Sequence, residues 1–147
     1  MKLSTRTRYG TRALLELALH QKGGPVALKD IAGQQQISLP YLEHLVAPLI
    51  AAGIIRSVKG PRGGISLARR PADIKLIDVV HLLEGSLAPV DCLEDPDACK
   101  RSGFCATRDV WGGLKGAIDG FLEAITLQDL LEKQKNKGQQ GKSMYYI

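Results

Sequence analysis

The sequence predicts a mainly α-helical fold with a small β-hairpin wing: a winged helix-turn-helix followed by a long C-terminal dimerisation helix. Apolar residues recur three and four positions apart in three successive segments before residue 53, which indicates three amphipathic helices. Two short alternating stretches, residues 54–58 and 65–68, flank a cluster of turn-forming residues, which indicates a hairpin. A broad apolar stripe over residues 107–125 indicates one further long helix.

The first two helices are predicted to pack through small and branched apolar side chains. A cap at Ser4 or Thr5 opens the first helix, which is expected to run to about residue 20. The glycines and the proline of residues 21–25 end it. Residues 26–35 are predicted to form a second, shorter helix, with an interruption before residue 38.

The third helix is predicted to begin at a cap formed by Ser38. Pro40 is compatible with that start, because a first-turn proline lacks an N–H that has no partner within the helix anyway. Gly53 ends the helix. A second proline, Pro48, lies in its interior and is expected to kink the helix or split it in two.

The hairpin that follows has a basic tip, residues 59–64, with the sequence Lys-Gly-Pro-Arg-Gly-Gly. A helix-turn-helix followed by such a hairpin predicts a winged helix over residues 1–72. In that fold the second helix of the pair enters the major groove of DNA, and the wing contacts phosphates or the minor groove. The alternative is a hairpin tip that is basic only for solubility.

The chain is divided in charge as well as in pattern. Residues 1–72 hold 11 Lys and Arg against three Asp and Glu, a net charge of +8, whereas residues 73–147 hold nine against 12, a net charge of −3. A basic module of this size points to a polyanion as partner, most often a nucleic acid. A basic face that is simply solvated is the alternative.

The second half is predicted to contain a linking helix over residues 74–83 and then the long helix. A long helix beyond a complete small domain has little of its own to pack on, so we expect it to pair in antiparallel fashion with the same helix of a second subunit. Packing on the core of its own chain is the alternative. The predicted division is residues 73–106 for the linking helix and a cysteine-rich loop, 107–132 for the dimerisation helix and a short final helix, and 133–147 for a disordered basic tail.

All three cysteines of the chain, Cys92, Cys99 and Cys105, lie in that loop. The 147-residue chain has a charged N-terminus and no apolar run near the roughly 20 residues of a membrane span, so we expect a cytoplasmic protein with no membrane partner. In a reducing compartment three cysteines indicate metal or redox chemistry rather than disulfides. The loop is too polar to bury itself, and we expect it to need a metal or a crosslink to become ordered.

An enzyme is not expected. The sequence has no glycine-rich phosphate loop after a strand, no paired carboxylates in an apolar setting and no C-x-x-C motif, and no small-molecule substrate is predicted. A protein-docking winged helix with a structural zinc in the cysteine loop is the alternative from a different class.

Several of these segments resemble the Rrf-type family of bacterial transcription regulators, in particular its IscR-like members. The resemblance covers residues 1 to about 132 and is carried by residues 3–5 leading into Tyr9 and residues 13–14, by residues 37–43, by residues 52–64 and by residues 83–85 ahead of the cysteines. It implies a homodimer that binds palindromic promoter sites on double-stranded DNA. In IscR-like proteins the glutamate that matches Glu43 discriminates between two classes of DNA site, which makes the same role here a hypothesis. The residues implied to contact DNA are Ser38, Leu39, Pro40, Tyr41, Glu43 and His44 at the start of the recognition helix, and Lys59, Gly60, Pro61 and Arg62 at the wing tip.

The resemblance also implies that the cysteines hold an iron–sulfur cluster, [2Fe–2S] rather than [4Fe–4S], in a repressor that senses cluster status and controls genes of cluster biogenesis. The histidine that completes the cluster in IscR-like proteins is replaced by Arg108, which cannot be a ligand while protonated. The fourth ligand is therefore open. The options are Asp91, Asp109, His20, His44, His81, the partner subunit, a small thiol or water. A metal-free thiol regulator (CymR-like), a nitric-oxide sensor (NsrR-like) and a zinc protein remain alternatives.

Overall fold

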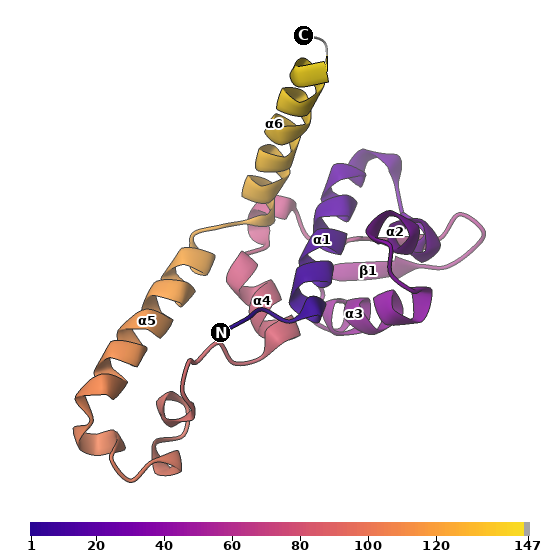
Figure 1. The fold of residues 1–147 in the computed structure, drawn as a ribbon. Coiled ribbons are helices and arrows are strands. Elements are labelled where there is room, and N and C mark those ends of the chain that lie inside the picture. The colour runs from indigo at the N-terminus through magenta and orange to yellow at the C-terminus, as the bar shows by residue number, and fades with distance from the viewer. Residues whose placement is uncertain (146–147) are drawn as a thin grey trace.

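The structure is a computed structural model that describes the backbone of residues 1–145 and side chains as far as residue 139. It consists of a helical head with a two-stranded hairpin, a helix that projects away from the head, and a last helix that returns beside it (Figure 1). The helices and strands are α1 (Thr5–Leu19), α2 (Leu28–Gln35), α3 (Leu39–Ala51), β1 (Ile55–Val58), β2 (Gly64–Leu67), α4 (Leu76–Glu84), α5 (Ala106–Glu123) and α6 (Leu127–Tyr145).

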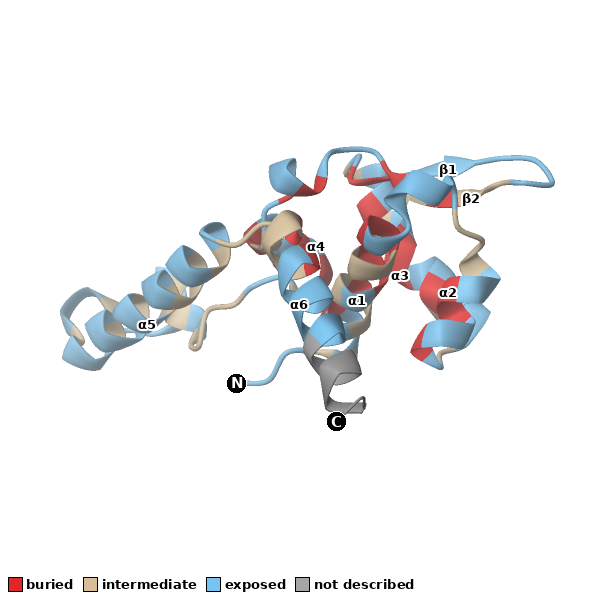
Figure 2. Ribbon diagram, turned by 90° about the horizontal axis from the view of Figure 1, so that it is seen from above, coloured by how far each residue is buried: buried red, intermediate tan, exposed pale blue. Residues whose placement is uncertain are grey.

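The core of the protein lies where α1 is surrounded by α2, α3, α4 and the hairpin (Figure 2). Burial of these side chains removes apolar surface from water, which is the main force that holds the head together. The largest side chains that are less than 2% exposed come from all of these elements and include Leu14, Ile31, Leu42, Leu49, Ile65 and Val79. The predicted winged helix-turn-helix is therefore confirmed, with a mainly helical fold and one antiparallel hairpin.

The first and third helices begin as the sequence predicts. The side chain of Ser4 accepts a hydrogen bond from the N–H of Thr7, and that of Ser38 accepts one from the N–H of Tyr41. Each cap satisfies a backbone donor that has no partner within its helix.

The second helix begins two residues later than predicted, at Leu28, because Val26 pairs with the wing. The backbone N–H of Val26 donates to the carbonyl of Ile65 at 2.9 Å, and the N–H of Ile65 donates back at 2.9 Å. Gly64 makes this approach possible, since its φ is 156° and a β-carbon there would lie 2.2 Å from the carbonyl oxygen of Val26. The pairing fixes the base of the wing to the head.

A kink or a split of the third helix was expected at Pro48, and the split does not occur. Helix α3 runs without interruption through Pro48 to Ala51, and the carbonyl of Pro48 accepts from the N–H of Ala52 at 3.0 Å. The proline lies in the last turn, so it removes a single hydrogen bond and leaves the preceding turns intact.

The expected short final helix and disordered tail are also wrong within the described residues. Helix α6 continues to Tyr145, and only residues 146–147 of the predicted tail lie outside the described backbone. Its start is fixed by Thr126 and Asp129, which cap each other's backbone N–H groups, and by the buried side chains of Leu127 and Leu131. Once that costly first turn is formed, a sequence rich in Lys and Gln and free of proline extends the helix.

Helix α5 stands apart from the head and none of its residues is buried (Figures 1 and 2). The chain returns to the head at residues 125–127, where Leu76 N–H donates to Ile125 O at 2.8 Å and Leu127 N–H donates to Ile74 O at 2.9 Å. Within the described residues, no helix is both long enough and apolar enough to cross a membrane.

Candidate nucleic-acid interface and cysteine segment

One face of α3 is turned to solvent at the start of the helix. Ser38, Leu39, Pro40, Glu43 and His44 are exposed, whereas the opposite face is buried in the core. The hydroxyl of Ser38 serves as the helix cap, yet it keeps its own hydrogen available to donate. Five of the six residues predicted on this helix thus lie where an extended partner can reach them.

Tyr41 differs from the other five because it is half-buried against α1. Its hydroxyl donates to Oγ1 of Thr5 at 3.3 Å, and its ring meets the ring of Tyr9 edge to face with centroids 6.3 Å apart. The Arg12 guanidinium lies 5.4 Å from the centroid of the Tyr9 ring, within cation–π range. Tyr41 therefore holds the start of α3 against α1, and this stack carries an exposed cation that we did not predict from the sequence.

The wing tip is fully exposed at Lys59, Gly60, Pro61 and Arg62. Figure 1 shows it projecting from the side of the head where α2 and the start of α3 lie. In the part of the chain that the structure describes, no ion pair neutralises either cation of the tip. The wing tip is thus an exposed basic surface, and the outer face of α3 is an exposed polar one.

The cysteine segment, residues 85–105, is made of three single 3₁₀ turns: Asp91–Leu93, Pro96–Ala98 and Ser102–Phe104. Its polar side chains organise it locally. Oδ1 of Asp95 accepts from the N–H of Asp97 at 3.1 Å, and the hydroxyl of Ser102 donates to the carbonyl of Pro96 at 2.7 Å. These hydrogen bonds fix the local shape of the turns.

The three thiols are free and accessible. Cys92 and Cys105 are half-buried and Cys99 is exposed. Among the described residues, no three His, Cys, Asp or Glu side chains come together in a group that could hold a metal ion. The donor set therefore suits a thiolate-bound metal in chemistry, but the segment must close to bring the three sulfurs together.

Arg108 stands at the position where the resemblance predicts the last ligand, and it ties the two ends of the segment together. Its Nε donates to the carbonyl of Cys92 at 3.1 Å. The histidines have neighbours elsewhere: Nδ1 of His20 is 2.9 Å from the carbonyl of Glu16, and His44 lies on the exposed face of α3.

Cys105 is the N-cap residue directly before α5. Its environment favours the thiolate form of its side chain. Its Sγ lies 3.1 Å from Oγ1 of Thr107. That hydrogen bond, together with the backbone N–H of Arg108, lowers the pKa of the Cys105 thiol below its usual value. A lowered pKa raises the fraction of reactive thiolate at neutral pH.

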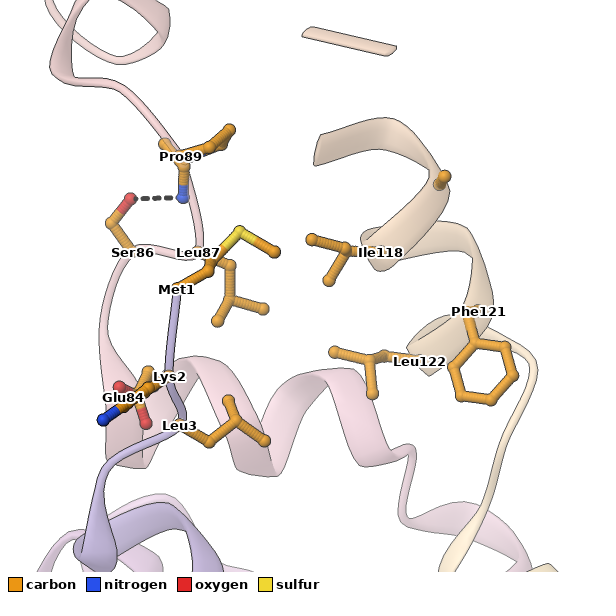
Figure 3. Close-up of a pocket in the computed structure, with 12 residues that line it drawn as sticks. Met1, Lys2, Leu3, Glu84, Ser86, Leu87, Pro89, Ile118, Phe121 and Leu122 are labelled. Atoms are coloured by element: carbon orange, nitrogen blue, oxygen red, sulfur yellow. Dashed lines mark hydrogen bonds between the residues drawn. The ribbon is translucent and has the colours of Figure 1, made fainter. Parts of the chain in front are cut away.

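The outer stripe of α5 is apolar and uncovered. Val110 is 63% exposed and Phe121 is 69% exposed, and Leu114 lies between them on the same stripe. Phe121 also lines an open apolar groove of about 800 Å³ between α5 and the N-terminal segment. Figure 3 shows Ile118 and Leu122 pointing across this groove toward the N-terminal segment.

Ionic contacts connect α5 to α4. Lys75 pairs with Glu123, and Nε2 of His81 lies 3.6 Å from Oδ1 of Asp119. Asp119 also pairs with Lys115 at 2.6 Å, and this contact lowers the pKa of the Asp119 carboxyl. His81 is thus engaged with α5 rather than with a cysteine.

Comparison with known proteins gives one consistent result. The Rrf2 family, described as iron-dependent transcriptional regulators, matches residues 3–133. The protein rrf2 of Nitratidesulfovibrio vulgaris is 47% identical over 131 residues, which are 89% of this chain and 87% of that protein. The structure of T. potens IscR is similar with a TM-score of 0.75 and 43% identity, over 91% of this chain and 88% of that one. The structure of CymR, the global cysteine regulator of B. subtilis, is similar with a TM-score of 0.77 and 38% identity, over 90% and 98%.

Proposed function

Because the chain belongs to the Rrf2 family of transcriptional regulators, we propose that it is a DNA-binding switch whose cysteine segment senses iron–sulfur cluster status. Membership of that family makes it a regulator and not an enzyme. The observation that carries the proposal is the place of the three free thiols. They lie on the one segment that joins α4 of the DNA-binding head to the exposed helix α5.

The recognition surface consists of the outer face of α3 and the wing tip. Glu43 and His44 are exposed side chains that can reach base edges in the major groove, where a carboxylate accepts from the amino group of cytosine. Lys59 and Arg62 supply phosphate contacts, which add affinity without reading sequence. Tyr41 supports this surface indirectly, because it holds the start of α3 against Thr5 and Tyr9.

DNA binding through the wing predicts a specific salt dependence. Replacing Lys59 or Arg62 with Ala is expected to weaken binding to every duplex and to reduce the slope of log affinity against log salt by about 1 for each lost phosphate contact. The measurement is fluorescence anisotropy with a labelled duplex over a series of salt concentrations. Lys133→Ala, which removes an exposed charge from α6, is the control and should leave the slope unchanged. An unaltered slope in both wing variants would exclude the wing from the DNA interface.

A separate experiment tests the hypothesis that Glu43 restricts the choice of DNA site. A carboxylate that faces DNA repels phosphate unless it finds a donor, so Glu43→Ala is expected to broaden the set of sites bound by the metal-free protein. Competition binding against palindromes that differ at single base pairs measures the preference. Glu132→Ala removes the same charge from the exposed surface of α6 and serves as the control. If Glu43→Ala keeps the site preference of the unmodified protein, Glu43 is not a specificity determinant.

A homodimer that binds palindromic DNA is supported by the exposed stripe of α5. Val110, Leu114 and Phe121 form a continuous apolar surface on a helix that buries none of its own residues. Exposed apolar surface of this kind marks an interaction site. In an antiparallel pair of α5 helices, a single symmetric contact would bury the stripes of both subunits. The symmetry of such a dimer matches the symmetry of a palindrome.

Cys92, Cys99 and Cys105 are the residues that would hold the cluster, for which we propose the [2Fe–2S] type. When bound, such a cluster supplies an iron site that is sensitive to oxidants. The carboxylates of Asp91 and Asp109 are the nearest non-thiol donors in sequence, and Arg108 positions the backbone of Cys92 instead of acting as a ligand. Closure of the segment shifts α5 relative to α4, and this changes the spacing of the two heads on DNA. We expect genes of cluster biogenesis to be the targets.

A metal-free thiol regulator is the second candidate, favoured by the environment of Cys105. The lowered pKa of the Cys105 thiol and the exposure of Cys99 suit reversible oxidation. Iron and sulfide analysis of protein purified without oxygen separates the two candidates. A coloured protein that contains both elements supports the cluster. A colourless protein without iron after anaerobic reconstitution supports thiol chemistry.

A further inference from the structure

The last residue of α4, Glu84, is bound to the first turn of α1. Its carboxylate accepts from the N–H of Ser4 at 2.9 and 3.2 Å, from the hydroxyl of Ser4 at 2.9 Å, and from the hydroxyl of Thr7. The contact spans 80 residues of sequence between Ser4 and Glu84. One carboxylate thus satisfies several donors at the beginning of the helix around which the head is built.

The position of this carboxylate is electrostatically favourable. A negative charge at a helix N-terminus is stabilised by the helix dipole and by the unpaired N–H groups of the first turn. The hydrogen bond from Thr7, followed by those from Ser4, lowers the pKa of the Glu84 carboxyl below its usual value. Thr7 is only 2% exposed, so its hydroxyl has little access to water in place of Glu84. The two helix ends are therefore held by charged and largely enclosed hydrogen bonds.

Next to Glu84, α4 packs closely against α1 at Gly10. A β-carbon at Gly10 would lie 2.4 Å from Cδ1 of Leu83, so α4 and α1 approach each other more closely than two side chains would allow. Leu83 is itself buried in the core. A movement of the end of α4 must therefore move α1 or break this contact.

The same first turns of α1 hold the recognition helix. Thr5, next to Ser4, accepts from the hydroxyl of Tyr41 at 3.3 Å, and Tyr9, one turn further on, meets the ring of Tyr41 edge to face. Tyr41 lies in the first turn of α3, between the exposed residues Pro40 and Glu43. The orientation of the DNA-reading end of α3 thus depends on the N-terminus of α1.

On its other side Glu84 borders the cysteine segment. Gly85 ends α4 with a φ of 83°, a conformation that favours glycine, and the chain then runs to Cys92. The hydroxyl of Ser86 donates to the carboxylate of Glu94, which binds the beginning of the segment to residues beyond Cys92. The surroundings of Cys92 are therefore connected to the end of α4 through Gly85 and Ser86.

We propose that Glu84 is a positioning residue that transmits the state of the cysteine segment to the recognition helix. The contacts run from Glu84 to Ser4 and Thr7, and from the adjoining turns of α1 to Tyr41. This inference rests on the proposed function, because it supplies a route within one subunit from the segment to α3. It is separate from the change in head spacing, which acts through α5 and the dimer.

The first test needs neither a cluster nor DNA. Amide hydrogen exchange is compared between the full-length metal-free protein and Glu84→Gln, which keeps the shape of the side chain but removes its charge. We expect faster exchange at residues 5–9 and also at residues 39–43 of α3, by roughly fivefold or more, since couplings of this kind typically change an equilibrium by about 5- to 150-fold. Ser4→Ala, which weakens the same joint from the other side, should show the same pattern if Glu84→Gln folds poorly.

The control for this experiment is Glu123→Gln, which removes the charge of another carboxylate that contacts α4, because Glu123 on α5 pairs with Lys75 at the start of α4. It should leave exchange at residues 39–43 unchanged. Faster exchange that is confined to α1 in Glu84→Gln, or an equal effect of both variants on residues 39–43, would overturn the proposal. Either result would make Glu84 a local brace of α1 and nothing more.

The second test measures the coupling itself and separates this inference from the proposed function. The affinity for a palindrome is measured for the anaerobically reconstituted protein and for its Cys92→Ala variant, and the ratio of the two affinities is taken. The same ratio is then measured in the Glu84→Gln background. The ratio is expected to move toward one by about fivefold or more in Glu84→Gln. A ratio of one in the otherwise unmodified protein would reject segment control of DNA binding, and hydrogen exchange would then decide the role of Glu84. A ratio that differs from one and is unchanged by Glu84→Gln would reject the route through Glu84 alone.

Discussion

Replacing Leu114 with Glu is expected to convert the protein from a dimer to a monomer. Leu114 lies between Val110 and Phe121 on the uncovered stripe of α5. In an antiparallel pair the new carboxylate would be buried near its own symmetry mate, and an unpaired buried charge costs several kcal/mol. Leu114 is exposed and does not belong to the core of the head, so the fold of the head should persist.

The consequence for DNA binding is large because a dimer holds two heads on one palindrome. Loss of the second head removes the high effective concentration of an already tethered partner, which is commonly worth on the order of 100-fold or more in affinity. Sedimentation equilibrium measures the oligomeric state, and anisotropy with a full palindrome and an isolated half-site measures binding. We expect weaker binding to the palindrome and unchanged binding to the half-site.

Gln134→Glu, which adds the same charge to the exposed surface of α6, is the control for Leu114→Glu and should remain dimeric. A Leu114→Glu protein that sediments as a dimer would show that the stripe of α5 is not the interface. Val110→Glu provides an independent check on the same stripe, four residues away.

Replacing Cys92 with Ala is expected to abolish iron and sulfide binding and, with it, the response of DNA binding to oxygen. Only three thiols are present, so removal of one leaves two, and the remaining donors cannot compensate for the lost thiolate. The readouts are visible absorption, iron and sulfide content, and DNA affinity before and after exposure to air. The unmodified protein should change affinity on oxidation, and Cys92→Ala should not.

Arg108→Ala is the matched control for the loss of Cys92. The guanidinium of Arg108 binds the carbonyl of Cys92 but cannot donate an electron pair to iron, so its removal should leave iron content largely intact. Complete loss of iron in Arg108→Ala would show that the tether between the two ends of the segment is indispensable for cluster binding. Iron retained in full by Cys92→Ala would exclude Cys92 as a ligand.

Local features of this fold were predictable because they depend on neighbours in sequence. Ser4 and Ser38 cap helices by bonding to backbone groups three residues away, and the spacing of apolar residues sets the buried face of each helix. The wing tip follows from the turn-forming residues between two alternating stretches. The helical conformation of the tail was not predicted, because composition alone does not reveal that Leu127 and Leu131 are anchored in the core.

The exposure of the candidate DNA-contacting residues was largely predictable, and the arrangement of the three cysteines was not. The exposed residues of α3 and the wing lie on single elements, whose periodicity decides which side chains face outward. The cysteines share one segment, yet their distances depend on three consecutive turns and on Arg108, so the spacing of thiols in sequence did not predict their arrangement. Tyr41 was assigned to DNA from its place on the helix, and its contact with Thr5 was not foreseen.

The sequence by itself therefore determined the order of the elements, the basic head, the apolar stripe of α5 and the concentration of thiols between them. Only the tertiary structure decided that the exit of α4 is held to the start of α1 by Glu84, and that α1 in turn holds the first turn of α3. These contacts join residues about 80 and 36 positions apart. Such pairs leave no periodic signal in the chain, because closing a long loop depends on the packing of the whole core rather than on the residues that finally meet.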